Sequence, residues 1–150
     1  MNAQSIINLK DDQFTDSLVA ERIMGEPKPD YVPENYLDLN VIPSADAPLS
    51  PKKCWACYCY YDHGDVPEWE PQPFSNDIRW AYLMEEHLRE RGLALPYADY
   101  LAKILERTEA KVTRFDLAHA TPLQRCQAAI WLHQEKTCAT EKSDEGDGKR

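Results

Sequence analysis

The chain has no apolar run long enough to cross a membrane and no short motif that marks a known kind of active site. No stretch approaches about 18 consecutive apolar residues. The opening residues, MNAQSIINLKDD, lack the basic start and apolar core of a signal peptide. The glycine-rich phosphate loop, the HExxH zinc motif and the GxSxG serine motif are also missing. We therefore expect a cytoplasmic protein that is not an enzyme, with no membrane segment, catalytic residue or cofactor.

Basic residues are scarce as well. The 150 residues include 17 Lys and Arg against 26 Asp and Glu, which gives a net charge of −9. An acidic surface repels the phosphate backbone of nucleic acids, so direct nucleic-acid binding is disfavoured. Residues 111–136 depart from this pattern, with four basic and two acidic side chains. A hydrophobic content of 43% is typical of a soluble globular domain.

The proline-rich part of the chain is not expected to form regular structure. Nine of the eleven prolines lie between Pro27 and Pro73, and proline fixes φ and donates no backbone hydrogen bond. The sequence therefore predicts a long loop inserted at about residues 26–53. Residues 137–150 contain almost no apolar side chains, which is typical of a disordered tail. We expect a single domain over residues 1–136.

Four segments have the apolar spacing of amphipathic helices. They are residues 12–24, the stretch between Ser75 and Gly92, residues 97–107, and residues 121–134. In the first segment, the side chains expected on the buried side are Phe14, Leu18, Val19 and Ile23.

Capping residues mark the ends of these segments. Ser75 is expected to cap the start of the second helix, and Pro96 to occupy the first position of the third. Residues 121–124, Thr-Pro-Leu-Gln, form a capping box with proline at the first helical position. Gly25 and Gly92 are suited to the left-handed conformation that ends a helix.

Two further segments have the character of strands. Residues 54–61 (CWACYCYY) are rich in aromatic side chains, and residues 111–117 (KVTRFDL) alternate between apolar and polar. We expect them to form a short antiparallel sheet. Since apolar helix faces need a sheet to cover, the predicted fold is α+β, a layered helix/sheet/helix sandwich with a proline-rich loop and a disordered tail.

The cysteine-rich stretch has a metal-binding alternative. Cys54, Cys57, Cys59 and His63 are four possible zinc ligands in one short run. Strand geometry opposes this arrangement, because Cys54 would then point away from Cys57 and Cys59. We favour a strand that binds no metal, and a small zinc-binding protein remains the alternative.

Two sets of residues are candidates for binding. Aromatic side chains are enriched at protein interfaces, and the interface candidates are Tyr31, Tyr36, Trp55, Tyr58, Trp69 and Phe74. The same residues could instead cover the domain's own sheet. The second set, Lys111, Arg114 and Arg125, could form a basic pocket for a small ligand or nucleotide near the start of the last helix. A further possibility is that Arg125 pairs with an acidic residue.

Three motifs resemble a known family. They are VAERIMG at residues 19–25, PFSNDI at residues 73–78 and ATPLQRCQAAI at residues 120–130. In this order they are similar to the phage ABA-sandwich domain, found in small proteins of tailed phages and prophages, although Asn76 stands where that family usually has threonine. The resemblance implies layers of helix, sheet and helix. It also implies the setting of a phage accessory protein in the cytoplasm of an infected host cell. Because the chain has no catalytic motif and carries an acidic surface and candidate interface aromatics, we expect it to bind a host or phage protein.

Overall fold

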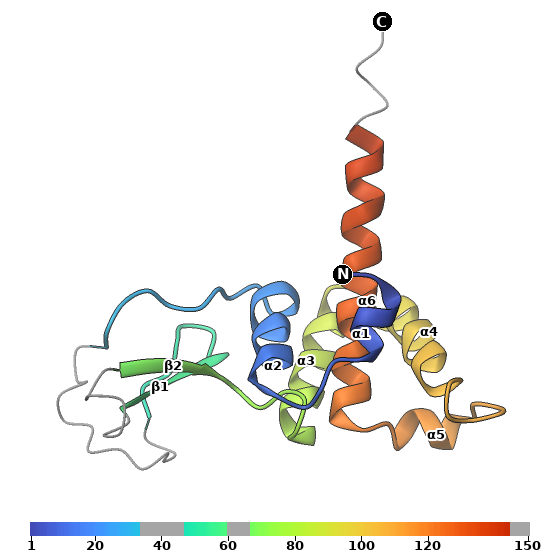
Figure 1. The fold of residues 1–150 in the computed structure, drawn as a ribbon, viewed down its shortest axis with the longest axis horizontal. Coiled ribbons are helices and arrows are strands. Elements are labelled where there is room, and N and C mark those ends of the chain that lie inside the picture. Colours follow the sequence, from blue (N-terminus) through green and yellow to red (C-terminus); the bar gives the residue numbers. More distant parts are fainter. Residues whose placement is uncertain (34–46, 60–66, 145–150) are drawn as a thin grey trace, which may run out of the picture.

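The computed structural model describes residues 1–33, 47–59 and 67–144, with the side chains of Cys59 and of residues 142–144 excepted. Over these residues the chain forms helices and one short antiparallel hairpin, which confirms the predicted α+β class (Figure 1). In chain order the elements are α1 (Ala3–Ile7), α2 (Gln13–Leu18), the π-helical η1 (Val19–Ile23), β1 (Trp55–Cys59), β2 (Pro67–Pro71), α3 (Ile78–Glu90), α4 (Ala94–Leu105), α5 (Arg114–Ala118) and α6 (Pro122–Asp144).

Helix α6 is the centre of the helical part. Its first half contacts α1, η1, α3 and α4, and four of its side chains are almost completely buried: Cys126, Ala128, Ala129 and Ile130. Small side chains let neighbouring helices approach closely, so α4 and α6 pack directly on each other. The second half of α6 extends beyond the other helices (Figure 1).

The predicted capping box starts α6. The Thr121 amide donates to Gln124 Oε1 at 2.8 Å, and the Gln124 amide donates to Thr121 Oγ1 at 3.2 Å. The expected end near residue 134 is wrong, because the helix continues to Asp144 through part of the tail that we expected to be disordered. Once a helix has been nucleated, each added turn needs only its own backbone bonds. Residues 145–150 lie outside the described residues.

The first predicted helix forms as α2 and η1. Asp12 is its N-cap and accepts from the Thr15 amide at 3.1 Å. At the other end Gly25 has φ +70°, and the Glu26 amide donates to the Ala20 carbonyl at 2.9 Å. Phe14 was expected on the buried side but is exposed, because Thr15, Leu18 and Val19 occupy the inner face.

Strand β1 lies within the strand predicted for residues 54–61, but its partner is β2. The register pairs Cys57 with Trp69. Strand β2 (PEWEP) begins and ends in proline, and the sequence did not indicate it. Proline is tolerated here because the described sheet has only two strands, so one side of β2 does not need to donate to a neighbouring strand.

The strand predicted at residues 111–117 is wrong, because this segment contains helix α5. Thr113 and Asp116 form a capping box. The Thr113 amide donates to Asp116 Oδ2 at 2.7 Å, and the Asp116 amide donates to Thr113 Oγ1 at 3.3 Å. Local side-chain bonds of this kind favour a helix start over an extended strand.

Helices α3 and α4 lie close to where the sequence placed them, with different starts. The N-cap of α3 is Asp77, which accepts from the Arg79 amide at 2.9 Å, and not Ser75. Gly92 ends this helix with φ +72°, as expected. Helix α4 begins at Ala94, so Pro96 occupies its third position and not its first. Proline is still accepted there because the first-turn amides have no partner within the helix.

The hairpin lies at one side of the molecule, next to α2 (Figure 1). The helices α3, α4 and α6 pack largely on one another, so the sheet is a lateral layer that flanks the helical part. The proline-rich insertion has no helix or extended strand in residues 26–33 and 47–53. It adds a single antiparallel bridge between Leu49 and Ala56. Residues 34–46 lie outside the described residues.

Candidate functional site

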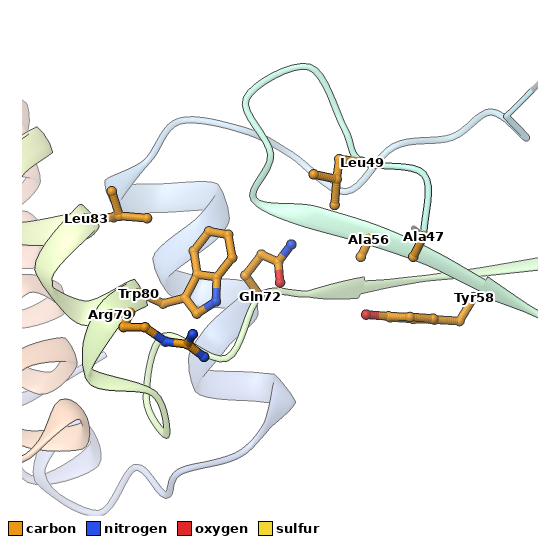
Figure 2. Close-up of a pocket in the computed structure, with 8 residues that line it drawn as sticks. All are labelled: Ala47, Leu49, Ala56, Tyr58, Gln72, Arg79, Trp80 and Leu83. Atoms are coloured by element: carbon orange, nitrogen blue, oxygen red, sulfur yellow. The ribbon is translucent and has the colours of Figure 1, made fainter. Parts of the chain in front are cut away.

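A groove runs between α3 and the hairpin. One cavity of about 470 Å³ lies between the outer face of α3 and β1, and an adjoining cavity of about 420 Å³ lies between α3 and the loop before β1. Trp80 and Leu83 line both cavities, so we treat them together as the α3 groove. Figure 2 shows these two side chains on α3 facing Leu49, Ala56 and Tyr58 across the opening.

The floor of the α3 groove is apolar. Phe74 is fully buried and packs edge-on against Trp80, with ring centroids 5.8 Å apart. Above this floor Leu83 is 52% exposed and Leu49 is 45% exposed. Two large aliphatic side chains are therefore left in water on opposite sides of one groove.

The rim of the α3 groove carries charges of both signs. Lys52 and Lys53 lie on the loop side, while Glu86 and Glu90 lie on the α3 side. At the other end Arg79 lines the cavity, and its guanidinium is already bound to Asp77, with Nη2 2.6 Å from Oδ2. The groove is thus a short apolar channel between polar edges, without one dominant charge.

A buried carboxylate fixes the hairpin side of the groove. Glu26, directly after Gly25, accepts from Ser50 Oγ, from the Lys52 amide at 2.5 Å and from the Cys54 amide at 3.1 Å. The Glu26 carbonyl also accepts from Trp55 Nε1 at 2.9 Å. These bonds tie the end of η1 to the turn that leads into β1.

A second buried carboxylate fixes the junction between β2 and α3. Asp16 on α2 accepts from the Ser75 amide at 2.6 Å. Burial raises the pKa of Asp16 to about 6, with the nearby carboxylates of Asp12 and Asp11 adding to the effect. The hydrogen bond from the Ser75 amide opposes this increase without cancelling it. Ser75 therefore positions the chain ahead of α3 through its backbone and is not the helix cap.

Three of the six predicted interface aromatics are core residues. Trp55, Trp69 and Phe74 are buried, so the alternative that they cover the domain's own sheet holds for these three. Tyr58 is partly buried and lines the α3 groove. Tyr31 is exposed, and its ring lies edge-on to Trp69 at 5.6 Å. Tyr36 lies outside the described residues.

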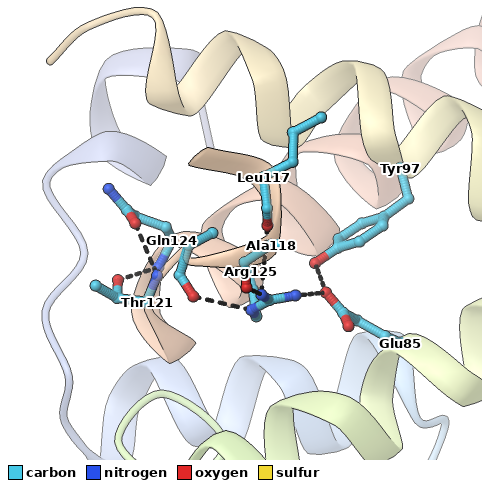
Figure 3. A network of polar contacts seen from close by, with 8 residues as sticks. Glu85, Tyr97, Leu117, Ala118, Thr121, Gln124 and Arg125 are labelled. Atoms are coloured by element: carbon cyan, nitrogen blue, oxygen red, sulfur yellow. Dashed lines mark hydrogen bonds and ion pairs between the residues drawn. The ribbon is translucent and has the colours of Figure 1, made fainter. Parts of the chain in front are cut away.

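The basic ligand pocket predicted from Lys111, Arg114 and Arg125 is not formed as expected. Lys111 and Arg114 are exposed, whereas Arg125 is only 5% exposed. Its guanidinium is bound within the fold (Figure 3): Nη1 lies 2.5 Å from Glu85 Oε1, Nε donates to the Ala120 carbonyl at 3.0 Å, and Nη2 donates to the Ala118 carbonyl at 2.9 Å. The alternative that Arg125 pairs with an acidic residue is correct.

The partner of Arg125 is shared with a tyrosine. The Tyr97 hydroxyl donates to Glu85 Oε1 at 2.6 Å, and burial together with the Glu85 charge raises the pKa of Tyr97. Arg125 also lies over the Tyr82 ring, 5.1 Å from its centroid. This network joins α3, α4 and α6. It holds α3 in place from the side of the helix that faces away from the groove.

Two of the four possible zinc ligands can be placed in the fold. Cys54 and Cys57 are buried, and burial together with the Glu26 charge raises the pKa of the Cys54 thiol to about 12. The Cys59 side chain and His63 lie outside the described residues. Among the residues that are described, no three His, Cys, Asp or Glu side chains are placed to hold a metal ion. The zinc alternative stays a prediction, because half of its residues are not described.

The residues that form the α3 groove were not singled out in the sequence. Trp80 and Leu83 are three residues apart on α3, outside the apolar stripe that Ile78, Ala81, Met84 and Leu88 form at helical spacing. An apolar pair on the polar side of an amphipathic helix is a usable signal for a surface site. Glu26 has no comparable signal, because its partners lie 24 to 28 residues further along the chain.

Comparisons with known proteins found no match to this chain. No family model matches the chain, and neither a curated protein nor a solved structure matches it. Within the described residues, none of the helices is both long and apolar enough to span a membrane.

Replacing Arg125 by Met should strongly destabilise the fold. The change leaves the Glu85 carboxylate without its cation and the carbonyl groups of Leu117, Ala118 and Ala120 without this donor, and loss of one partner of a buried ion pair costs about 3 kcal/mol or more. The free energy of unfolding in urea measures this loss. The matched control is Arg89→Met, which breaks the exposed pair with Glu86 and should leave stability unchanged. Equal stability of the two variants would show that the Arg125 network is not structural.

Asp16 should make stability fall as the pH rises. Its pKa is raised from 3.8 to about 6 in the folded chain, so between these values the folded state binds more protons than the unfolded state. The stabilisation of wild type relative to Asp16→Asn should therefore decrease by about 2 to 3 kcal/mol from about pH 4 to about pH 7. Urea unfolding across this range tests the difference, with the exposed Asp99→Asn as control. A constant difference would contradict a raised pKa at Asp16.

Proposed function

We propose that this chain is a non-enzymatic protein-binding module whose α3 groove receives an apolar side chain from a partner protein. The observation that carries the proposal is the exposure of Leu83 and Leu49 on opposite sides of a floor made by Trp80 and Phe74. Contiguous exposed apolar surface with a polar rim is a common feature of binding sites. Burying both leucines against a ligand side chain would release water from them and supply the driving force.

The rim favours a peptide over a small anionic ligand. A bound segment that runs along the groove would meet Lys52 and Lys53 on one edge and Glu86 and Glu90 on the other. A phosphate group in the same place would gain little net attraction, because the two carboxylates offset the two lysines. The preferred ligand is thus a peptide segment with one large apolar side chain and polar residues of both charges beside it.

The proposed setting comes from the sequence motifs. Residues 19–25, 73–78 and 120–130 resemble the phage ABA-sandwich domain, and on that basis we propose a phage or prophage accessory protein in the host cytoplasm. The partner would then be a host or phage protein. The α3 groove supports the binding part of this proposal.

Selection from a random peptide library tests the groove while the partner is still unidentified. The immobilised wild-type chain should enrich peptides that carry one large apolar or aromatic residue. Their affinity should fall about tenfold or more on Leu83→Glu, because a buried charge at the contact would be left unpaired. Fluorescence anisotropy with labelled peptides measures the change.

The matched control is Leu95→Glu, because Leu95 is also a highly exposed leucine but lies on α4, outside the residues that line the groove. This variant should bind the selected peptides as wild type does. The proposal fails if the library yields no enrichment, or if Leu83→Glu and Leu95→Glu bind the peptides equally well.

A further inference from the structure

Three basic side chains from two parts of the chain meet beside α6, and a fourth, Arg22, lies close enough for its charge to act on His133. Arg22 lies on η1, Arg91 follows α3, and His133 and Lys136 lie one turn apart on α6. We refer to these four residues as the basic cluster. Three of them, together with apolar side chains, line a small cavity of about 30 Å³; its lining is Ile23, Leu88, Arg91, Leu93, Ala129, Leu132, His133 and Lys136.

The cations of the basic cluster are not used in ion pairs within the described part of the chain. There, ion pairs join Asp77 to Arg79, Glu86 to Arg89 and Glu85 to Arg125, whereas none involves Arg22, Arg91 or Lys136. Arg91 Nη1 donates to the Ile23 carbonyl at 3.4 Å, which places its guanidinium against η1. These cations therefore give a positive local potential on a protein of net charge −9.

The lowered pKa of His133 indicates that positive charges lie close to its imidazole. Partial burial lowers the pKa of His133, and the positive charges of Arg22 and Arg91 lower it further. Both guanidinium groups therefore act on the same imidazole. A site with this positive potential stabilises an anion, and the bound anion would in turn stabilise the cluster.

We propose that the basic cluster binds a phosphoryl group, held by Arg22, Arg91, His133 and Lys136. Guanidinium groups donate paired N–H bonds to phosphate oxygens, and the lysine ammonium adds a mobile point charge. The cavity is about the size of one water molecule, so it has no room for a base or sugar ring. The phosphoryl group would thus sit at the mouth, with the remainder of a phosphate monoester directed to solvent.

This site is separate from the α3 groove and from the basic pocket expected at Lys111 and Arg114. None of the four cluster residues lines the groove, and the cavity beside the cluster shares no lining residue with the groove. Phosphate binding and peptide binding can therefore succeed or fail independently.

Titration of the ¹⁵N-labelled chain with inorganic phosphate tests the proposal directly. At constant ionic strength, amide signals near Arg91 and His133 should shift and saturate at millimolar phosphate. Arg91→Gln and Lys136→Gln should each weaken binding about tenfold, since each removes a charge-assisted hydrogen bond. Lys136 is exposed, so its variant keeps the test valid even where Arg91→Gln lowers stability.

The matched control is Arg89→Gln, which removes a nearby exposed arginine that is paired with Glu86 and should leave phosphate binding unchanged. Adenosine monophosphate and adenosine form a second pair of probes. Binding of the monophosphate but not of adenosine supports recognition of the phosphoryl group. The proposal is overturned if phosphate gives no saturable shift, or if Arg89→Gln weakens binding as much as Arg91→Gln.

Discussion

The Glu26 carboxylate ties the hairpin side of the α3 groove to the helices. A two-stranded hairpin is marginally stable by itself in water, and this one needs an anchor. Glu26 supplies it by accepting from the Ser50 hydroxyl and from the Lys52 and Cys54 amides. Gly25, with φ +70°, turns the chain out of η1 so that the carboxylate reaches this turn.

The opposite wall of the groove is fixed by other buried charges. Arg125 pairs with Glu85 on the inner side of α3, and Asp16 accepts from the Ser75 amide ahead of that helix. Because α3 is held from within by these contacts, Trp80 and Leu83 remain on its outer side facing the hairpin (Figure 2). Both walls are thus positioned before a ligand arrives, which lowers the entropy cost of binding.

Local signals in the sequence predicted much of the helical part. The capping box at residues 121–124 and the glycines that end η1 and α3 are each set by neighbouring residues, and the structure has all of them. The same logic could have found α5, since Thr113 and Asp116 have the same three-residue spacing as Thr121 and Gln124. The alternating pattern of residues 111–117 suggested a strand instead. A helix of five residues is too short to display the repeat of apolar residues that identifies longer helices.

The remaining features depend on contacts between distant residues. Strand β2 is bounded by prolines and is defined by its pairing with β1. Among the expected interface aromatics, Trp55 and Trp69 proved to be core, because a small sheet must use its own aromatics to bury its surface. The side-chain partners of Glu26 lie at least 24 residues away from it, and the acidic partner of Arg125 lies 40 residues away, so no local pattern identifies either anchor or the groove between them.

The most direct test of the central claim is the affinity of Glu26→Ala for a peptide selected on the wild-type chain. The measurement is made where circular dichroism shows the helices intact, with the exposed Glu21→Ala as the matched control on η1. If the α3 groove is formed jointly by α3 and an anchored hairpin, Glu26→Ala should lose binding at least about tenfold while Glu21→Ala keeps it. Unchanged affinity in Glu26→Ala would contradict the account.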